Sequence, residues 1–146
     1  MAKGTTFSNQ LLQLIFNGTA ISSPSLAMNE SSTPLTSLYV SLHVADPTAG
    51  GNQSSSEATA YTGYARVAVA RTTGGWTVTS NSVSPAANVV FPLSTGGSAI
   101  SATNWAIGTA SSGAGEILWT GTISPAIAIS NGVTPILTSA STVVET

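Results

Sequence analysis

Two of the three cationic side chains in the 146-residue chain, Arg66 and Arg71, lie in the stretch YTGYARVAVARTTGGWTV, among aromatic residues. Arginines beside aromatic side chains can bind phosphate or stack on bases. However, the alternation of Ala65, Val67 and Val69 predicts a strand that turns these residues toward a core. Arg66 would then point to the other face, and Arg71, at an odd separation, to the opposite one. We therefore expect two separate orienting contacts, each to a carboxylate, a backbone carbonyl or a neighbouring subunit.

The residues after this strand are expected to reverse the chain. Gly74 and Gly75 suit a tight turn, and Trp76 opens the next β-like run, WTVTS. The sequence therefore predicts a hairpin across the two glycines.

Catalytic chemistry would depend on very few side chains. His43 is the only histidine and Asp46 the only aspartate, so a Ser-His-Asp triad would have to use both. No G-x-S-x-G motif identifies a nucleophile among the many serines. The carboxylates are scattered, whereas glycoside hydrolysis needs two that face each other. We predict no catalytic residue and no enzyme, with His43 on the exposed or interface face of a strand.

Metal and cofactor motifs are also missing from the sequence. Asp46, Asn52 and Glu57 flank one polar loop, but they lack the D-x-[DN]-x-[DN]-G spacing of a calcium loop. The absence of cysteine excludes disulfides and Cys-based zinc sites. Glycine-rich pieces such as TTGG and STGG do not have the spacing of phosphate-binding loops. We therefore expect neither a metal nor a cofactor.

Composition limits the kinds of partner. Charged residues make up 5% of the chain, against about 25% in a typical soluble domain, and Ser and Thr make up roughly 30%. Three cations do not suit a nucleic-acid or anionic-membrane surface. No apolar run approaches the ~20 residues of a membrane span. Such a neutral surface favours self-association, so we predict a homo-oligomer. The alternative is a soluble monomer with an unusually neutral surface.

One helix is predicted, over residues 5–17, in TTFSNQLLQLIFNG. Gly18 can end it in the left-handed conformation. Apolar residues at helical spacing form one row, with a second row beside it. The first row is Phe7, Leu11, Leu14 and Ile15, and the second is Leu12 and Phe16. One row is expected on the chain's own core and the other on a neighbour. The alternative is a helix held between the core and a loop.

The rest of the chain reads as short strands. LYVSLHV alternates with period two, which predicts a half-buried strand over residues 38–44, with Tyr39, Ser41 and His43 on the less buried face. A flexible polar loop is expected at 45–60. Further short β-like runs follow, separated by turn residues such as Asn131-Gly132. We predict one domain, 1–146, that is an antiparallel β-sandwich or jelly-roll-like fold with one short N-terminal helix.

Several segments carry a family resemblance. They are MAKGTTFSNQLLQLIFNGTAI, SLYVSLHVADPTAGGNQ, TGYARVAVART, GGWTV, VSPAANVVFP, NWAIGTASSGAGEILWTGTISP and NGVTP. With these segments the chain resembles, along nearly its whole length, small virion proteins of tailed bacteriophages that are labelled tail-fibre proteins. The resemblance implies a structural virion component, made in the bacterial host cytoplasm, and it implies no catalytic residues.

The position in the virion follows from the kind of chain. It is short and has neither a fibrous repeat nor a coiled-coil stalk. We therefore expect a multi-copy capsid decoration or cement protein; the alternative is a tail-associated or tail-fibre protein that contributes to host-surface binding. The expected partners are the major capsid protein or tail proteins. The candidate assembly interface comprises Phe7, Leu11, Leu12, Phe16, Tyr39, His43, Arg66 and Arg71.

Overall fold

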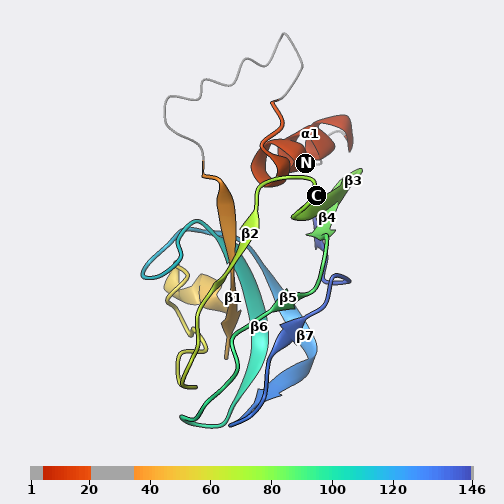
Figure 1. Ribbon diagram of the computed structural model, residues 1–146. Coiled ribbons are helices and arrows are strands. Elements are labelled where there is room, and N and C mark those ends of the chain that lie inside the picture. Colours follow the sequence, from red (N-terminus) through yellow and green to blue (C-terminus); the bar gives the residue numbers. More distant parts are fainter. Residues whose placement is uncertain (1–4, 21–34, 146) are drawn as a thin grey trace. The chain divides into compact units, whose positions relative to one another are not determined.

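The computed structural model describes residues 5–20 and 35–145 (Figure 1). Most of the Ser/Pro-rich connection after the helix lies outside these ranges. The chain divides into two compact units. The first unit comprises Met1–Ser37, Val69–Ala87 and Thr138–Thr146, and the second comprises Leu38–Ala68 and Asn88–Leu137. That the whole chain, 1–146, forms a single domain remains a prediction.

The first unit combines one helix with a small sheet. Helix α1 spans Thr5–Asn17, as predicted, and Gly18 follows it with a φ of 63°. The strands are β3 (Trp76–Thr79), β4 (Ser82–Pro85) and β9 (Val143–Val144), in the antiparallel order β3-β4-β9. The helix packs against β3 and β4.

The core of the first unit lies between this helix and sheet. Leu12 and Phe16 are fully buried, and the Phe16 ring meets the Trp76 ring edge-on at 4.8 Å and 67°. The first of the two predicted rows, Phe7, Leu11, Leu14 and Ile15, is only half-buried. Leu12 and Phe16 therefore belong to the chain's own core, which corrects their placement among interface residues: a side chain without exposed surface cannot touch a neighbour.

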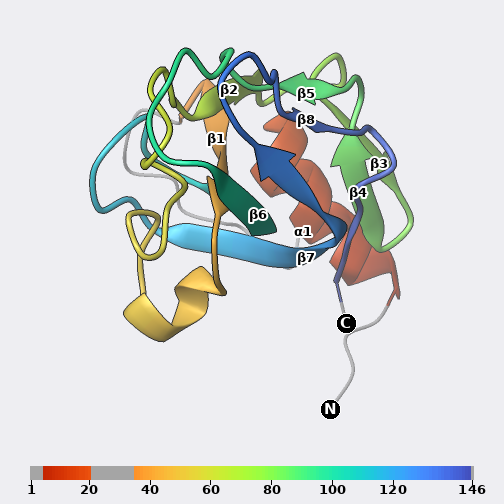
Figure 2. The same cartoon turned by 90° about the horizontal axis from the view of Figure 1, so that it is seen from below.

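The second unit holds most of a four-stranded sheet of order β2-β1-β6-β7; by the bounds given above, Ser37 of β1 and the last two residues of β2 belong to the first unit. Its strands are β1 (Ser37–His43), β2 (Val67–Ala70), β6 (Ile100–Gly108) and β7 (Ile117–Ile129). Strands β5 (Val89–Val90) and β8 (Ile136–Leu137) form a separate pair, and η1 (Pro47–Gly50) is a short 3-10 helix. Figure 2 shows β7 at the edge of the larger sheet. Pro125 has no amide hydrogen to donate, and an edge strand tolerates this because no further strand pairs with it on its outer side.

Strand β1 is covered on both faces, which corrects the half-buried strand of the prediction. Leu38, Val40 and Leu42 are buried on one face, but Ser41 and His43 are also fully buried. The reason is the following segment: residues 45–60 fold back, so that Val44 donates to the Ser56 carbonyl and Ala58 to the Leu42 carbonyl. His43 is therefore an interior residue and does not lie on an exposed or interface face.

The segment 45–60 is more structured than a simple polar loop. Asp46 caps η1 by accepting from the Thr48 amide, and Gln53 and Ala58 are fully buried. Its flexibility stays a prediction.

The hairpin predicted across Gly74-Gly75 is wrong. The turn is present, because the amides of Gly75 and Trp76 donate to the Thr72 carbonyl, and Trp76 does start a strand. However, β2 belongs to the four-stranded sheet, whereas β3 pairs with β4. A Cβ on Gly75 would lie 2.1 Å from the Ala70 carbonyl oxygen, so only glycine fits this turn. Asn131-Gly132 likewise turns the chain between strands of different sheets.

The fold class is confirmed: antiparallel sheets with one short helix, as in an all-β sandwich. Among the described residues no helix is long and apolar enough to span a membrane.

Candidate functional site

The most polar part of the interior is an ion pair between Arg66 and Glu57 in the second unit. Arg66 Nε donates to Glu57 Oε1 at 2.6 Å, and Arg66 Nη2 donates to Glu57 Oε2 at 2.9 Å. The two side chains are 2% and 8% exposed. Such a fork is the geometry in which a guanidinium binds a carboxylate most strongly. The hydrogen bonds to Glu57 raise the pKa of Arg66, so the guanidinium is ionised at neutral pH.

Tyr64 completes this cluster from the same stretch of chain. Its hydroxyl donates to Glu57 Oε1 at 2.7 Å and accepts from the Leu42 amide at 3.3 Å. Burial, together with the adjacent Glu57 charge, raises the pKa of Tyr64. The Tyr61 ring stands edge-on to Tyr64 at 5.5 Å. The phenol is therefore a fixed neutral donor that supports the carboxylate.

The remaining donors of Arg66 reach the connection between β6 and β7. Nη1 donates to the Ala110 carbonyl at 2.9 Å and Nη2 to the Gly113 carbonyl at 2.7 Å. We call residues 110–115, ASSGAG, the 110–115 loop. Figure 1 shows this blue-green loop beside the yellow segment that carries Glu57. The orienting contacts predicted for Arg66, to a carboxylate and to carbonyls, are thus present.

Gln53 holds the same loop from a second direction. Its side chain is fully buried; Nε2 donates to the Tyr39 carbonyl at 3.2 Å and Oε1 accepts from the Ala110 amide at 3.0 Å. The Gln53 amide donates to the Gly115 carbonyl at 2.9 Å. A Cβ on Gly108 would come within 2.1 Å of Gln53 Cδ, so glycine makes room for this side chain.

The outer part of the 110–115 loop is open to solvent. Ser111, Ser112, Gly113 and Ala114 are all exposed, and Gly113 has a φ of 72°. Buried polar side chains thus fix a loop whose own residues are small, neutral and accessible.

His43 holds the segment 45–60, which carries Glu57, in place. Its Nδ1 lies 2.9 Å from the Ser55 carbonyl, which can only accept, so Nδ1 carries the proton of the neutral ring. Nε2 then accepts from the Ser41 hydroxyl at 2.8 Å. Burial lowers the pKa of His43, against the nearby Glu57 charge that raises it. The ring is a neutral structural link at pH 7.

Arg71 makes a different set of contacts in the first unit. Its guanidinium donates to the carbonyls of Ile15 at 2.6 Å, Leu14 at 2.9 Å and Leu35 at 2.6 Å. Two of these are orphan carbonyls at the C-terminal end of α1, where a cation is favoured. Arg66 and Arg71 are thus separate contacts, as predicted, and neither is arranged as a phosphate site.

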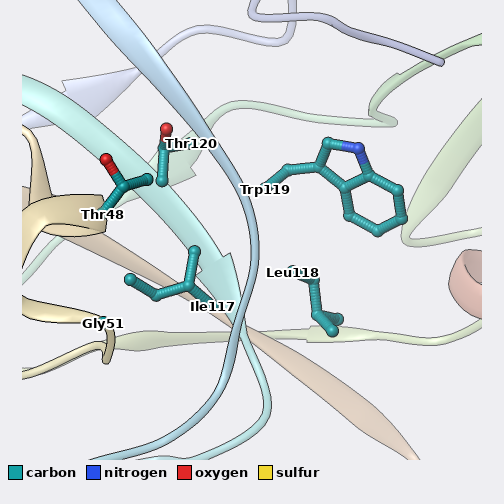
Figure 3. A pocket seen from close by; sticks show the side chains of 6 residues that line it. All are labelled: Thr48, Gly51, Ile117, Leu118, Trp119 and Thr120. Carbon is teal, nitrogen blue, oxygen red and sulfur yellow. The ribbon is translucent and has the colours of Figure 1, made fainter. Parts of the chain in front are cut away.

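A pocket of about 270 Å³ opens over the start of β7. Its lining residues are Thr48, Gly51, Ile117, Leu118, Trp119 and Thr120. In Figure 3 the side chains of Thr48 and Thr120 lie on one side of the β7 ribbon, and the Trp119 ring extends on the other. The register of β6 against β7 shifts here, between Ile107 and Gly108. The indole therefore does not face the two hydroxyls, and the pocket presents no combined stacking and hydrogen-bonding surface.

The predicted interface residues do not gather in one place. Leu12, Phe16, His43 and Arg66 are buried. For Arg66 this corrects the expectation that it points away from the core; its burial follows from its Glu57 partner. The half-buried members are Phe7, Leu11, Tyr39 and Arg71, for which an assembly role stays a prediction.

Sequence reasoning missed Gln53 and the partnership of Glu57. Both lie in the stretch expected to be a polar loop, and a lone Gln carries no spacing signal. In the part of the chain that the structure describes, no three His, Cys, Asp or Glu side chains gather where a metal ion could bind.

The comparisons with known proteins place the chain in a family. Residues 2–145 match the family model described as podophage GP4 fiber I protein gp80. The match covers almost the whole chain, so the protein belongs to this family, and the predicted resemblance to phage tail-fibre proteins is confirmed. No curated protein matches the chain.

Proposed function

We propose that this protein is a non-enzymatic structural subunit of a podophage fibre, carried on the virion. The observation that supports it most directly is the family match over residues 2–145, whose description is that of a fibre protein. That description favours the tail-fibre alternative over the capsid decoration protein that we expected from the short, repeat-free chain.

The contacts of the charged side chains agree with a structural role. Arg66 and Glu57 neutralise each other inside the second unit, and Arg71 binds carbonyls at the end of α1. His43 is neutral and hydrogen-bonded at both ring nitrogens. A catalytic base needs access to a substrate proton, which none of these buried, engaged groups offers. The proposed partners are other virion proteins and further copies of this chain.

Immunogold labelling of intact particles tests the location. Antibody raised against the purified protein should mark the fibres, and the copy number from quantitative mass spectrometry should match the number of fibres. Label spread over the capsid, with hundreds of copies per particle, would restore the decoration protein and contradict this proposal.

Incubation of the purified protein with host surface polysaccharide tests the absence of an enzyme. We expect no release of reducing ends. Release that disappears in His43→Ala or Glu57→Gln would show a hydrolase.

A further inference from the structure

The outer face of the β5–β8 pair in the second unit is apolar. The two strands lie side by side (Figure 2), and Val90 is the direct antiparallel partner of Ile136. These two side chains are 52% and 43% exposed, and Leu93, further along the same segment as Val90, is 48% exposed. They are three of the six large apolar side chains that are exposed among the described residues. We call Val90, Leu93 and Ile136 the β5–β8 patch.

Apolar residues occupy both faces of this pair of strands. Val89, Phe91 and Leu137 are buried on the inward face, next to the exposed side chains of the patch. An antiparallel strand that faces water on one side normally alternates apolar and polar residues, whereas a continuous apolar run indicates cover on both faces. Within the part of the chain that the structure describes, only the inward face is covered. The outer face therefore has the composition of an interface.

The backbone beneath the patch is held by hydrogen bonds. The Phe91 amide donates to the Pro135 carbonyl at 2.9 Å, and the Ser94 amide donates to the Val133 carbonyl at 2.9 Å. Two of the three side chains in the patch are β-branched and therefore have few rotamers to lose. Docking on the patch then costs little conformational entropy, which makes it a preformed contact surface.

Charge favours a second copy of this chain as the occupant. Between Asn88 and Leu137 the sequence has one charged residue, Glu116, which precedes β7, whereas β8 follows the other end of that strand. A typical soluble protein, with about 25% charged residues, would bring charges that lose hydration against the patch without gaining a partner. A second copy has 5% charged residues, and its own patch has none.

The antiparallel pairing also suits a contact between identical surfaces. Val90 and Ile136 hold equivalent places on the two strands, so a half-turn about an axis between them exchanges β5 with β8. Two such pairs placed face to face bring Val90 of each copy over β8 of the other. A two-fold contact requires a surface that complements itself, and an uncharged apolar patch meets this requirement.

We propose that the β5–β8 patch is a self-association site, through which two copies of the chain pack face to face about a two-fold axis. The patch is small, because a stable interface takes about 800 Å² from each partner. The contact is therefore weak between free molecules and becomes effective where other contacts hold copies close together. This inference rests on the proposed function, in which copies of the chain are neighbours in a fibre.

The first experiment is sedimentation equilibrium of the purified full-length chain at roughly 10–500 μM. The weight-average mass should rise with concentration from the 14.5 kDa of one chain toward twice that value. Val90→Glu should weaken association about tenfold or more, because it sets like charges against each other. Val44→Glu is the matched control and should associate like the unaltered chain, since Val44 is 41% exposed in the same unit but outside the patch.

The second experiment tests whether the patch meets itself. Val90→Lys should also remain at the mass of one chain, whereas an equimolar mixture of Val90→Lys and Val90→Glu should recover association, because opposite charges then face each other. Circular dichroism and unfolding midpoints check the fold of each variant. Val90→Thr keeps the branched shape and replaces one methyl group with a hydroxyl, so it should weaken association several-fold even if the charged variants unfold.

Three results would overturn the proposal. The first is an unaltered chain that stays at 14.5 kDa throughout; if Val90→Glu then fails to enter particles, the patch binds another virion protein instead. The second is equal weakening by Val44→Glu, which would assign the association to another surface. The third is a mixture of well-folded Val90→Lys and Val90→Glu that does not associate. Immunogold label away from the fibres rejects the proposed function, whereas the mass of the purified chain is independent of that result.

Discussion

Arg66 and Arg71 are five residues apart, but different groups stabilise their positive charges. Arg66 is buried in the second unit against a carboxylate, and its remaining donors reach loop carbonyls. Arg71 is half-buried in the first unit, and among the described residues its guanidinium donates to carbonyls alone, two of them at the end of α1. The comparison teaches that a guanidinium needs no acidic partner where a helix ends, because the helix end already carries partial negative charge.

Removing the acid from the buried pair should have the largest effect. Glu57→Leu leaves the Arg66 guanidinium charged and largely without its partner, so we expect a loss of about 3–5 kcal/mol in the free energy of unfolding. Urea denaturation followed by tryptophan fluorescence measures it. E57L/R66M should recover most of the loss; a double variant as unstable as Glu57→Leu would show that desolvated charge is not the cause.

Arg71→Met should have a smaller effect, of about 1–2 kcal/mol. The variant keeps the aliphatic stem but leaves the carbonyls of Leu14 and Ile15 to water. The same denaturation experiment applies, with circular dichroism at 222 nm to follow α1. A loss as large as that of Glu57→Leu would remove the distinction between the two arginines.

Acidification should weaken the link made by His43. Because burial lowers the folded-state pKa below the usual 6.5, the unfolded chain takes up the proton first. The contribution of neutral His43 to the free energy of unfolding is therefore fully present above pH 6.5. It decreases as the pH falls from 6.5 toward the folded-state pKa, by at most about 1.4 kcal/mol per pH unit. Unfolding midpoints at pH 7.5 and 5.5 measure the slope. His43→Gln should show less of it, and equal slopes would assign the effect to other groups.

The smallest effect is expected at Asp46, on the surface. Its carboxylate accepts from the Thr48 amide and hydroxyl, and these bonds, the amide first, lower the pKa of Asp46. Asp46→Ala should lower the unfolding midpoint slightly at pH 7 and not at all well below pH 3.8, where the carboxyl is protonated in both states. Thermal melts at the two pH values provide the check. A midpoint drop that persists in acid would mean that the carboxylate charge is not what caps η1.

The sequence was most informative where local periodicity decides the structure. Helix α1 has the predicted bounds, and Gly18 ends it in the left-handed conformation. Arg66 and Arg71 make separate contacts, as predicted, but not for the predicted reason: both lie just outside β2, Val67–Ala70, so strand alternation does not set where they point.

The wrong predictions concern which other segments of the chain pack against a residue or pair with its strand. Alternation in β1 showed which side chains share a face, but not that residues 45–60 cover the second face and bury His43. The strand after Arg66 and the strand from Trp76 were paired because they are neighbours in sequence, whereas their partners come from distant parts of the chain. Gln53 gave no signal, since its role depends on a loop 57 residues away. Glu57 gave none either, because nothing in the spacing of Glu57 and Arg66 shows that the chain folds back to pair them.

The division into two units affects how recombination between phages can exchange parts of this protein. The chain passes between the units after residues 37, 68, 87 and 137, so neither unit is one continuous piece of the gene. A single recombination event between phages therefore cannot exchange one unit and keep the other intact. Exchange of the whole second unit would need a crossover at each of these four passages.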